Sequence, residues 1–186
     1  VHSAEMLDRK SLASVGDTTG ERLTALLTET KAHTPEELAA NVARIGELLG
    51  RFALYVPARF TDDPAEQAKY WAVRSGIFPA VGGSRPAGTT CLSEDVAFHI
   101  EDLPRATAEL QALIARHGYD ACIYGHALED NYHFIINQSF SPPAEVARYE
   151  ALMNDVAELV SAGTTARSKP SMARGATWRP SSAASR

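Results

Sequence analysis

The chain has 186 residues, of which 45% are hydrophobic, and its formal net charge at pH 7 is −5. This length is enough for one domain with a buried core, or for one domain followed by a tail. The acidic balance offers no basic surface for nucleic acid, and no run of about 18 apolar residues provides a transmembrane helix. We therefore expect a soluble globular protein without either partner.

The two cysteines, Cys91 and Cys122, are too few for a zinc or iron–sulfur cage. Their spacing is not that of a secreted disulfide scaffold, so we expect reduced thiols in a cytoplasmic protein. The chain begins at Val1 without the charged and apolar regions of a signal peptide. This start predicts that no signal peptide is present and that the chain is a piece of something larger.

Four helices are expected, each with a proline at its first position, where the missing N–H group costs nothing. The four prolines are Pro35, Pro64, Pro104 and Pro142. Apolar residues at three-to-four spacing follow Pro35 as far as Gly50, and others follow Pro104 as far as Gly118. Each of these two helices is therefore expected to bury one stripe.

Short runs rich in β-branched and aromatic residues lie between these helices and predict strands. The expected strands are 25–30, 52–56, 95–100, 120–127 and 132–140. Alternation of strands and helices, with a hairpin near the end, predicts an α+β fold. Right-handed crossovers favour a ferredoxin-like plait, single or duplicated, with helices mostly on one face of an antiparallel or mixed sheet.

Two stretches lack periodicity. The loop "GGSRPAGTT", residues 82–90, contains glycine and proline, and loops placed by a rigid sheet often carry ligand contacts. After Val160 the sequence becomes polar, basic and of low complexity. We therefore expect a folded domain over residues 1–160 and an unstructured tail over residues 161–186.

The stretch "GHALEDNYHF" contains two histidines, His126 and His133. If Leu128 to Asn131 form the turn of a hairpin, Ala127 faces Tyr132 and His126 faces His133. Opposed residues have Cβ atoms about 4.5–5.5 Å apart, close enough for two imidazoles to bind one metal ion. The alternative is a pair of structural histidines bonded to the backbone or to the acidic pair in the turn. Spacing alone does not identify a third metal ligand.

Arg74, in "WAVRSGIF", is a second candidate because a guanidinium group can hold a substrate carboxylate through two hydrogen bonds. Trp71 lies three positions earlier and can pack beside it. The alternative is an arginine on the exposed surface of a helix.

Several segments, in order, resemble the C-terminal half of FAD-linked oxidases of the D-lactate dehydrogenase, glycolate oxidase and D-2-hydroxyglutarate dehydrogenase group. The most specific resembles the family signature G-H-x-x-x-x-N-x-H, which Gly125, His126, Asn131 and His133 match. The forms "GHAL" and "EDVA" most resemble long members with an added iron–sulfur domain. The segments are AEMLDRKSL, ALLTET, YWAVRSGIFPAVGGSRPAGTT, SEDVAFHI and GHALEDNYHFIINQSF.

The resemblance implies a cap over the flavin of an FAD-dependent D-2-hydroxy-acid dehydrogenase that moves hydride from C2 of a D-lactate-like substrate to the flavin. It implies that His126 and His133 bind a divalent metal, that Arg74 grips the substrate carboxylate and that Asn131 braces the turn near FAD. Imidazole and carboxylate ligands suit zinc, iron or manganese.

The partner of such a cap is the flavin domain of the parent chain. FAD is expected mainly on that missing N-terminal domain, and an iron–sulfur cluster only on another missing domain. The chain alone is expected to be inactive. The resemblance is compatible with a cytoplasmic parent or with one peripheral to the inner membrane.

The tail departs from the family, which has an acidic ligand followed by histidine in a segment like YDGSLKAEHGTGRNMAPF. Written in GC-rich codons and read one nucleotide later, that segment becomes TTARSKPSMARGATWRP, the sequence of residues 164–180. The pattern predicts a reading-frame change just before Thr164, with Ser171 and Met172 in place of the two ligands. We therefore expect weak tertiary contacts after Ser161 and an unburied Trp178.

Two other functions remain open from the sequence. One is a free-standing ferredoxin-like module that binds a small ligand or dimerises, and it predicts no exposed apolar face. The other is a metal-binding domain, in which His99 or Glu129 is the third ligand beside His126 and His133.

Overall fold

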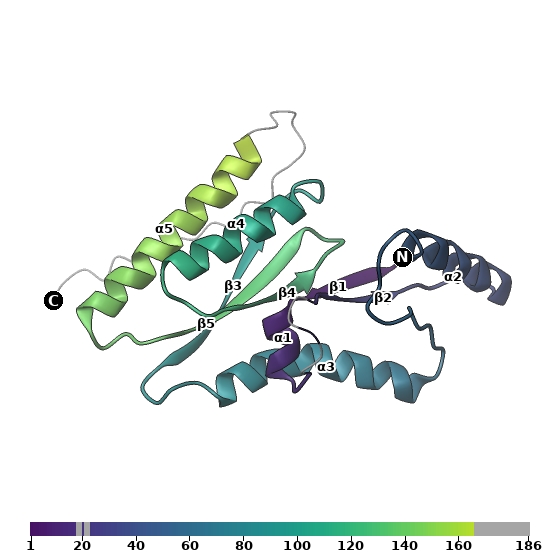
Figure 1. Cartoon of the computed structure of the whole chain (residues 1–186), viewed down its shortest axis with the longest axis horizontal. Helices are drawn as coiled ribbons and strands as arrows, with labels where there is room; N and C mark the ends of the chain where they lie inside the picture. The colour runs from purple at the N-terminus through teal and green to yellow at the C-terminus, as the bar shows by residue number, and fades with distance from the viewer. Residues whose placement is uncertain (18–19, 21–22, 166–186) are drawn as a thin grey trace.

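The computed structural model describes residues 1–17, 20 and 23–165, which form an α+β fold (Figure 1). The predicted fold class is confirmed. The elements in chain order are β1 (Ser3–Leu7), α1 (Arg9–Ser14), β2 (Ala25–Glu29), α2 (Pro35–Leu49), α3 (Pro64–Gly83), β3 (Thr90–Ala97), α4 (Leu103–Arg116), β4 (Cys122–His126), β5 (Asn131–Gln138) and α5 (Pro143–Thr165).

The five strands form one sheet in the order β2-β1-β4-β5-β3, and every neighbouring pair is antiparallel. The chain passes from β3 through α4 to β4, and β5 then inserts between those two strands. This arrangement is the split β-α-β unit of a ferredoxin-like plait. β1 and β2 extend the sheet beyond β4.

Helices cover both faces of the sheet, whereas the sequence pattern predicted a preference for one face. α4 and α5 lie on one face, and α1 and α3 lie on the other (Figure 1). The α4–α5 side holds the larger hydrophobic core, which includes Leu110, Phe134 and Leu152, all fully buried. The α1–α3 side holds a smaller core around Leu7, Ile77 and Ile135.

The helix starts agree with the proline pattern to within one residue. α2 begins at Pro35 after Thr34, whose hydroxyl accepts a hydrogen bond from the Glu37 amide at 3.2 Å. α3 begins at Pro64 after Asp63, whose carboxylate accepts one from the Ala65 amide at 2.9 Å. Each side chain satisfies a first-turn N–H group that has no partner within the helix.

The predicted strand at residues 52–56 is wrong. This segment forms no strand, and Phe52, Tyr55 and Val56 are each 64–68% exposed. A run of β-prone residues becomes a strand only where a neighbouring strand offers hydrogen-bond partners and packing, and this segment lies outside the sheet.

Other boundaries also differ from the sequence pattern. β3 begins at Thr90 rather than at residue 95, and α3 extends to Gly83, so the connection between them is shorter than the predicted loop. β1 and α1 were not predicted as elements. α5 continues past Val160 to Thr165, while Trp178 and the rest of the tail lie outside the described residues. None of the described helices combines the length and apolarity needed to cross a membrane.

Candidate functional site

The β4–β5 hairpin has a different register from the one that the sequence suggested. His126 pairs with Asn131, and Tyr124 pairs with His133, so the predicted His126–His133 opposition is wrong by two residues. The turn is formed by residues 127–130 and includes Asp130 at φ 59°, a left-handed conformation that aspartate tolerates. Because side chains alternate with a period of two, this shift leaves both histidines on the same face.

The two imidazole rings lie diagonally across the hairpin. Their centroids are 5.4 Å apart and their planes are nearly perpendicular. The ring of Tyr124 lies 5.3 Å from that of His133 on the same face. Burial raises the pKa of Tyr124, and the positive charge of Arg74 opposes that rise. The face is therefore aromatic, partly buried and close to a fixed positive charge.

Each histidine is held by a carboxylate from a neighbouring strand. Glu5 on β1 is directly opposite His126 in the β1–β4 register, and its Oε1 accepts a hydrogen bond from Nδ1 of that ring. Asp95 on β3 is directly opposite His133, and its Oδ1 lies 2.5 Å from Nδ1. Among the described residues, no hydrogen bond involves the Nε2 atom of either ring. Both Nε2 atoms are therefore available to a ligand.

Glu5 and Asp95 were not predicted as site residues, since the sequence suggested the turn acids Glu129 and Asp130 as partners of the histidines. A weak signal was present: Glu5 is the single charged residue in the strand "SAEML", between the apolar residues Ala4 and Met6. A charge there, in a strand with four buried positions, implies a buried partner.

Arg74 reaches the same face from α3. Its Nε donates to Oε2 of Glu5 at 3.0 Å, and its guanidinium carbon lies 5.0 Å from the centre of the Tyr124 ring. The side chain is 21% exposed, so it is not the freely solvated surface arginine of the alternative interpretation. Among the described residues, no hydrogen bond uses its two Nη atoms, and its ring contact is with Tyr124 rather than Trp71. The N–H groups of the two Nη atoms can therefore donate hydrogen bonds to a carboxylate.

Asn131 begins β5 opposite His126. Its side-chain Oδ1 is buried and has no hydrogen-bond partner in the described part of the chain. The described residues contain four other buried side-chain atoms without a partner, so this one leaves Asn131 free to accept a hydrogen bond but does not by itself indicate a ligand.

The described residues contain no group of three or more histidine, cysteine or acidic side chains able to hold a metal ion. His99 and Glu129, the predicted third ligands of a bare metal-binding domain, therefore do not complete the histidine pair. His126 and His133 supply two nitrogen donors at most. Any further donor must come from water, from a bound substrate or from residues outside the described ranges.

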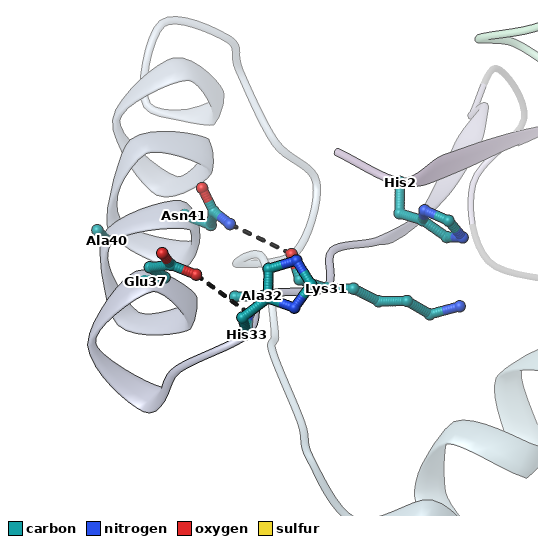
Figure 2. Close-up of a pocket in the computed structure, with 7 residues that line it drawn as sticks. All are labelled: His2, Lys31, Ala32, His33, Glu37, Ala40 and Asn41. Atoms are coloured by element: carbon teal, nitrogen blue, oxygen red, sulfur yellow. Dashed lines mark hydrogen bonds between the residues drawn. The ribbon is translucent and has the colours of Figure 1, made fainter.

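An open hollow lies elsewhere, between α2 and the ends of β1 and β2. Figure 2 shows Asn41 and Glu37 on α2 facing the chain at Lys31 and His33, with His2 beside them. The contacts across it are hydrogen bonds from Asn41 to the Lys31 carbonyl and from the His33 amide to Glu37. None of its lining residues belongs to the histidine site.

Comparison with known proteins places the geometry in context. Residues 1–164 match the family described as FAD linked oxidases, C-terminal domain. A solved structure of 4-ethylphenol oxidase from Gulosibacter chungangensis, in complex with isoeugenol, is similar with 15% sequence identity and a TM-score of 0.41. The similarity covers 87% of this chain and 37% of that one. The comparison with curated proteins found no match.

Proposed function

Because the chain belongs to the FAD linked oxidase C-terminal domain family, we propose that it is the substrate cap of a flavoprotein that oxidises a small D-2-hydroxy acid such as D-lactate. The observation that carries the proposal is the convergence of Arg74, His126 and His133 on one sheet face, joined by Glu5 and Tyr124.

Arg74 is suited to hold the carboxylate of the substrate. Glu5 occupies Nε and fixes the guanidinium plane, so the Nη pair remains for two parallel hydrogen bonds to one carboxylate. Packing over Tyr124 further restricts the guanidinium group. In the proposed reaction this fork orients the 2-hydroxy acid, and FAD, held mainly by a separate N-terminal domain, supplies the hydride acceptor.

His126 and His133 are suited to bind a divalent metal. Each donates Nδ1–H to a carboxylate, the usual arrangement around metal-binding histidines, and each keeps Nε2 free. Nitrogen donors and a substrate oxygen suit zinc, iron or manganese. When bound, such a metal supplies a Lewis acid for the 2-hydroxy and carboxylate oxygens. The described residues fit this role only in part, since two protein ligands leave the coordination shell to be completed by others.

The reading-frame proposal offers a reason for the incomplete ligand set. In the proposed intact gene, the acidic ligand and its neighbouring histidine lie at the positions now occupied by Ser171 and Met172. The family match ends at residue 164, where the frame change is placed. Sequencing the source DNA across codons 162–165 tests this. An unbroken frame, with no family motif in the adjacent frame, would contradict the proposed reading-frame change.

Exposed apolar side chains favour a cap over a free-standing module. Within residues 52–60, five large apolar side chains are exposed, and this surface would suit the flavin domain of the parent chain. An iron–sulfur cluster, if the parent has one, belongs to another domain, and we propose a cytoplasmic parent. The exposed side chains are Phe52, Leu54, Tyr55, Val56 and Phe60.

The test is a calorimetric titration of the full chain with Zn²⁺ and Mn²⁺. We expect weak binding that disappears in His126→Ala, because that variant removes one of two protein ligands. His99→Ala is the matched control, since His99 is an exposed histidine outside the site. Binding that survives His126→Ala but not His99→Ala would rule out the proposed metal site.

A separate titration tests the carboxylate role of Arg74. D-lactate is added to the metal-loaded chain and followed by NMR, and we expect Arg74→Met to weaken binding. Unchanged D-lactate affinity in that variant would contradict the proposed role.

A further inference from the structure

Glu5 is a buried charged residue at the centre of the histidine site. Its side chain is 4% exposed, and its two oxygens have different partners. Oε2 accepts from Nε of Arg74 at 3.0 Å, and Oε1 accepts from Nδ1 of His126. One carboxylate therefore connects the proposed substrate-binding arginine to a proposed metal-binding histidine.

This pairing determines which nitrogen of His126 carries the proton. A carboxylate has acceptor oxygens only, and the guanidinium group is always a donor. Nδ1 of His126 must therefore carry a proton, so in the neutral ring Nε2 is the nitrogen with the lone pair. A neutral histidine without such a partner is free to place the proton on Nε2, which would block a metal there.

Asp95 makes the corresponding contact with His133 but in a different setting. Its side chain is 61% exposed, and among the described residues its side-chain hydrogen-bond partner is His133 alone. Water competes for an exposed carboxylate, so this contact constrains its histidine less than Glu5 does. The two carboxylates therefore provide a matched comparison between a buried and an exposed partner.

We propose that Glu5 is the positioning residue of this site. Its carboxylate fixes Arg74 and His126 relative to each other, and it holds His126 in the tautomer whose Nε2 can bind a metal. The inference rests on the proposed function for its statement that the tautomer serves metal binding. The tautomer itself can be measured without metal, substrate or flavin.

The experiment is two-bond ¹H–¹⁵N NMR of the histidine rings in the metal-free full chain at about pH 9, where an ordinary imidazole is neutral. His126→Ala assigns the His126 signals. We expect the Nδ1–H tautomer for His126 in the wild type. In Glu5→Gln the single amide oxygen stays on Arg74, so the amide NH₂ group faces Nδ1 and the ring should switch to Nε2–H.

Asp95→Asn is the control, and it should leave the His126 tautomer unchanged. In Zn²⁺ titrations we expect Glu5→Gln to weaken binding by about tenfold or more, and Asp95→Asn to weaken it less. If Glu5→Gln fails to fold, the double variant Glu5→Met/Arg74→Met replaces the buried ion pair by apolar groups, a change that is often neutral for stability. It should also give the Nε2–H tautomer.

Protonated Nε2 in the wild type, or an Nδ1–H ring that persists in the folded Glu5 variants, would overturn the positioning role. The two proposals fail separately. If the wild type binds no metal but has the Nδ1–H tautomer at His126, and this tautomer switches in Glu5→Gln, the role of Glu5 is supported and the metal site is contradicted.

Discussion

The two faces of the central sheet carry different sets of polar side chains. On the α4–α5 face, polar groups pair with each other: the Tyr119 hydroxyl donates to Gln138, which is fully buried and donates in turn to the Glu145 carbonyl. On the α1–α3 face, Asn131 Oδ1 is buried without a partner in the described chain. Each side thus contains a buried atom without a partner in the described chain, since Nε of Arg148 on α5 has none either, but Arg74 and the two histidines lie together on the α1–α3 face.

Neighbouring residues of strand β5 face opposite sides of the sheet. Phe134 faces α4 and α5 and is fully buried, while the preceding His133 faces the site. We expect Phe134 to contribute mainly to stability and His133 mainly to ligand binding, while Ile135, on the same face as His133, is fully buried in the smaller core. Four substitutions probe the two faces, and their expected effects decrease from Phe134→Ala to Asp155→Asn.

Phe134→Ala should lower the free energy of unfolding by about 3–5 kcal/mol, because it leaves a cavity in the larger core. Chemical denaturation followed by circular dichroism measures the change. A loss below about 1 kcal/mol would mean that the α4–α5 face is not the main source of stability.

Gly125→Ala should lower the free energy of unfolding by about 1–3 kcal/mol. Gly125 has φ 152°, and an added Cβ would lie 2.6 Å from the Asn131 carbonyl oxygen and 2.9 Å from the Tyr132 Cα. Both contacts are with backbone, which cannot move aside without opening the hairpin. The same denaturation experiment applies, with Gly46→Ala on exposed α2 as control, since no atom lies within 4 Å of its added Cβ. Equal effects in the two variants would contradict the close approach.

His133→Ala should cost about 1 kcal/mol or less in unfolding free energy, although it is adjacent to Phe134. The lost hydrogen bond is to Asp95, which is largely exposed. Metal binding, by contrast, should be abolished. If the variant were as unstable as Phe134→Ala, the expected difference between Phe134 and His133 would be wrong.

Asp155→Asn should have the smallest effect, visible as a change in pH dependence. Hydrogen bonds from His117 and Arg116 lower the pKa of Asp155 below its ordinary value of 3.8. A lowered native pKa stabilises the fold above the unfolded-state pKa, and the contribution is lost as pH falls through the native value. Melting temperatures at about pH 6 and pH 2.5 should therefore differ less in Asp155→Asn than in the wild type. Glu158→Gln, at an exposed position on the same helix, should keep the wild-type difference.

Sequence patterns predicted the parts of the fold that depend on local chemistry. Proline positions located α2 and α3, and runs of β-prone residues located the two strands of the β4–β5 hairpin. The 52–56 segment was mistaken for a strand because strand formation depends on a neighbour that local sequence does not reveal. The short elements β1 and α1 had too few residues for a periodic signal.

Only part of the candidate site was predicted, because local sequence does not reveal which segments become neighbours. Arg74, Asn131 and the two histidines were identified from motifs, and the structure places Arg74 and both histidines on one face. Their carboxylate partners were missed because Glu5 lies 121 positions from His126, and Asp95 lies 38 positions from His133. Cross-strand partners are set by sheet order and register, and neither is visible in residue spacing.

The burial of Glu5 also bears on how the chain folds. Its two partners follow it by 69 and 121 positions, so β1 must enclose a charged group whose compensation comes from distant segments. Contacts of such long sequence separation close large loops and are slow to form. Until α3 and β4 are both in place, β1 carries an uncompensated carboxylate toward an apolar interior. We therefore expect β1 to dock late in folding. The contacts of Glu5 with both Arg74 and His126 then mark chains that have reached the native state.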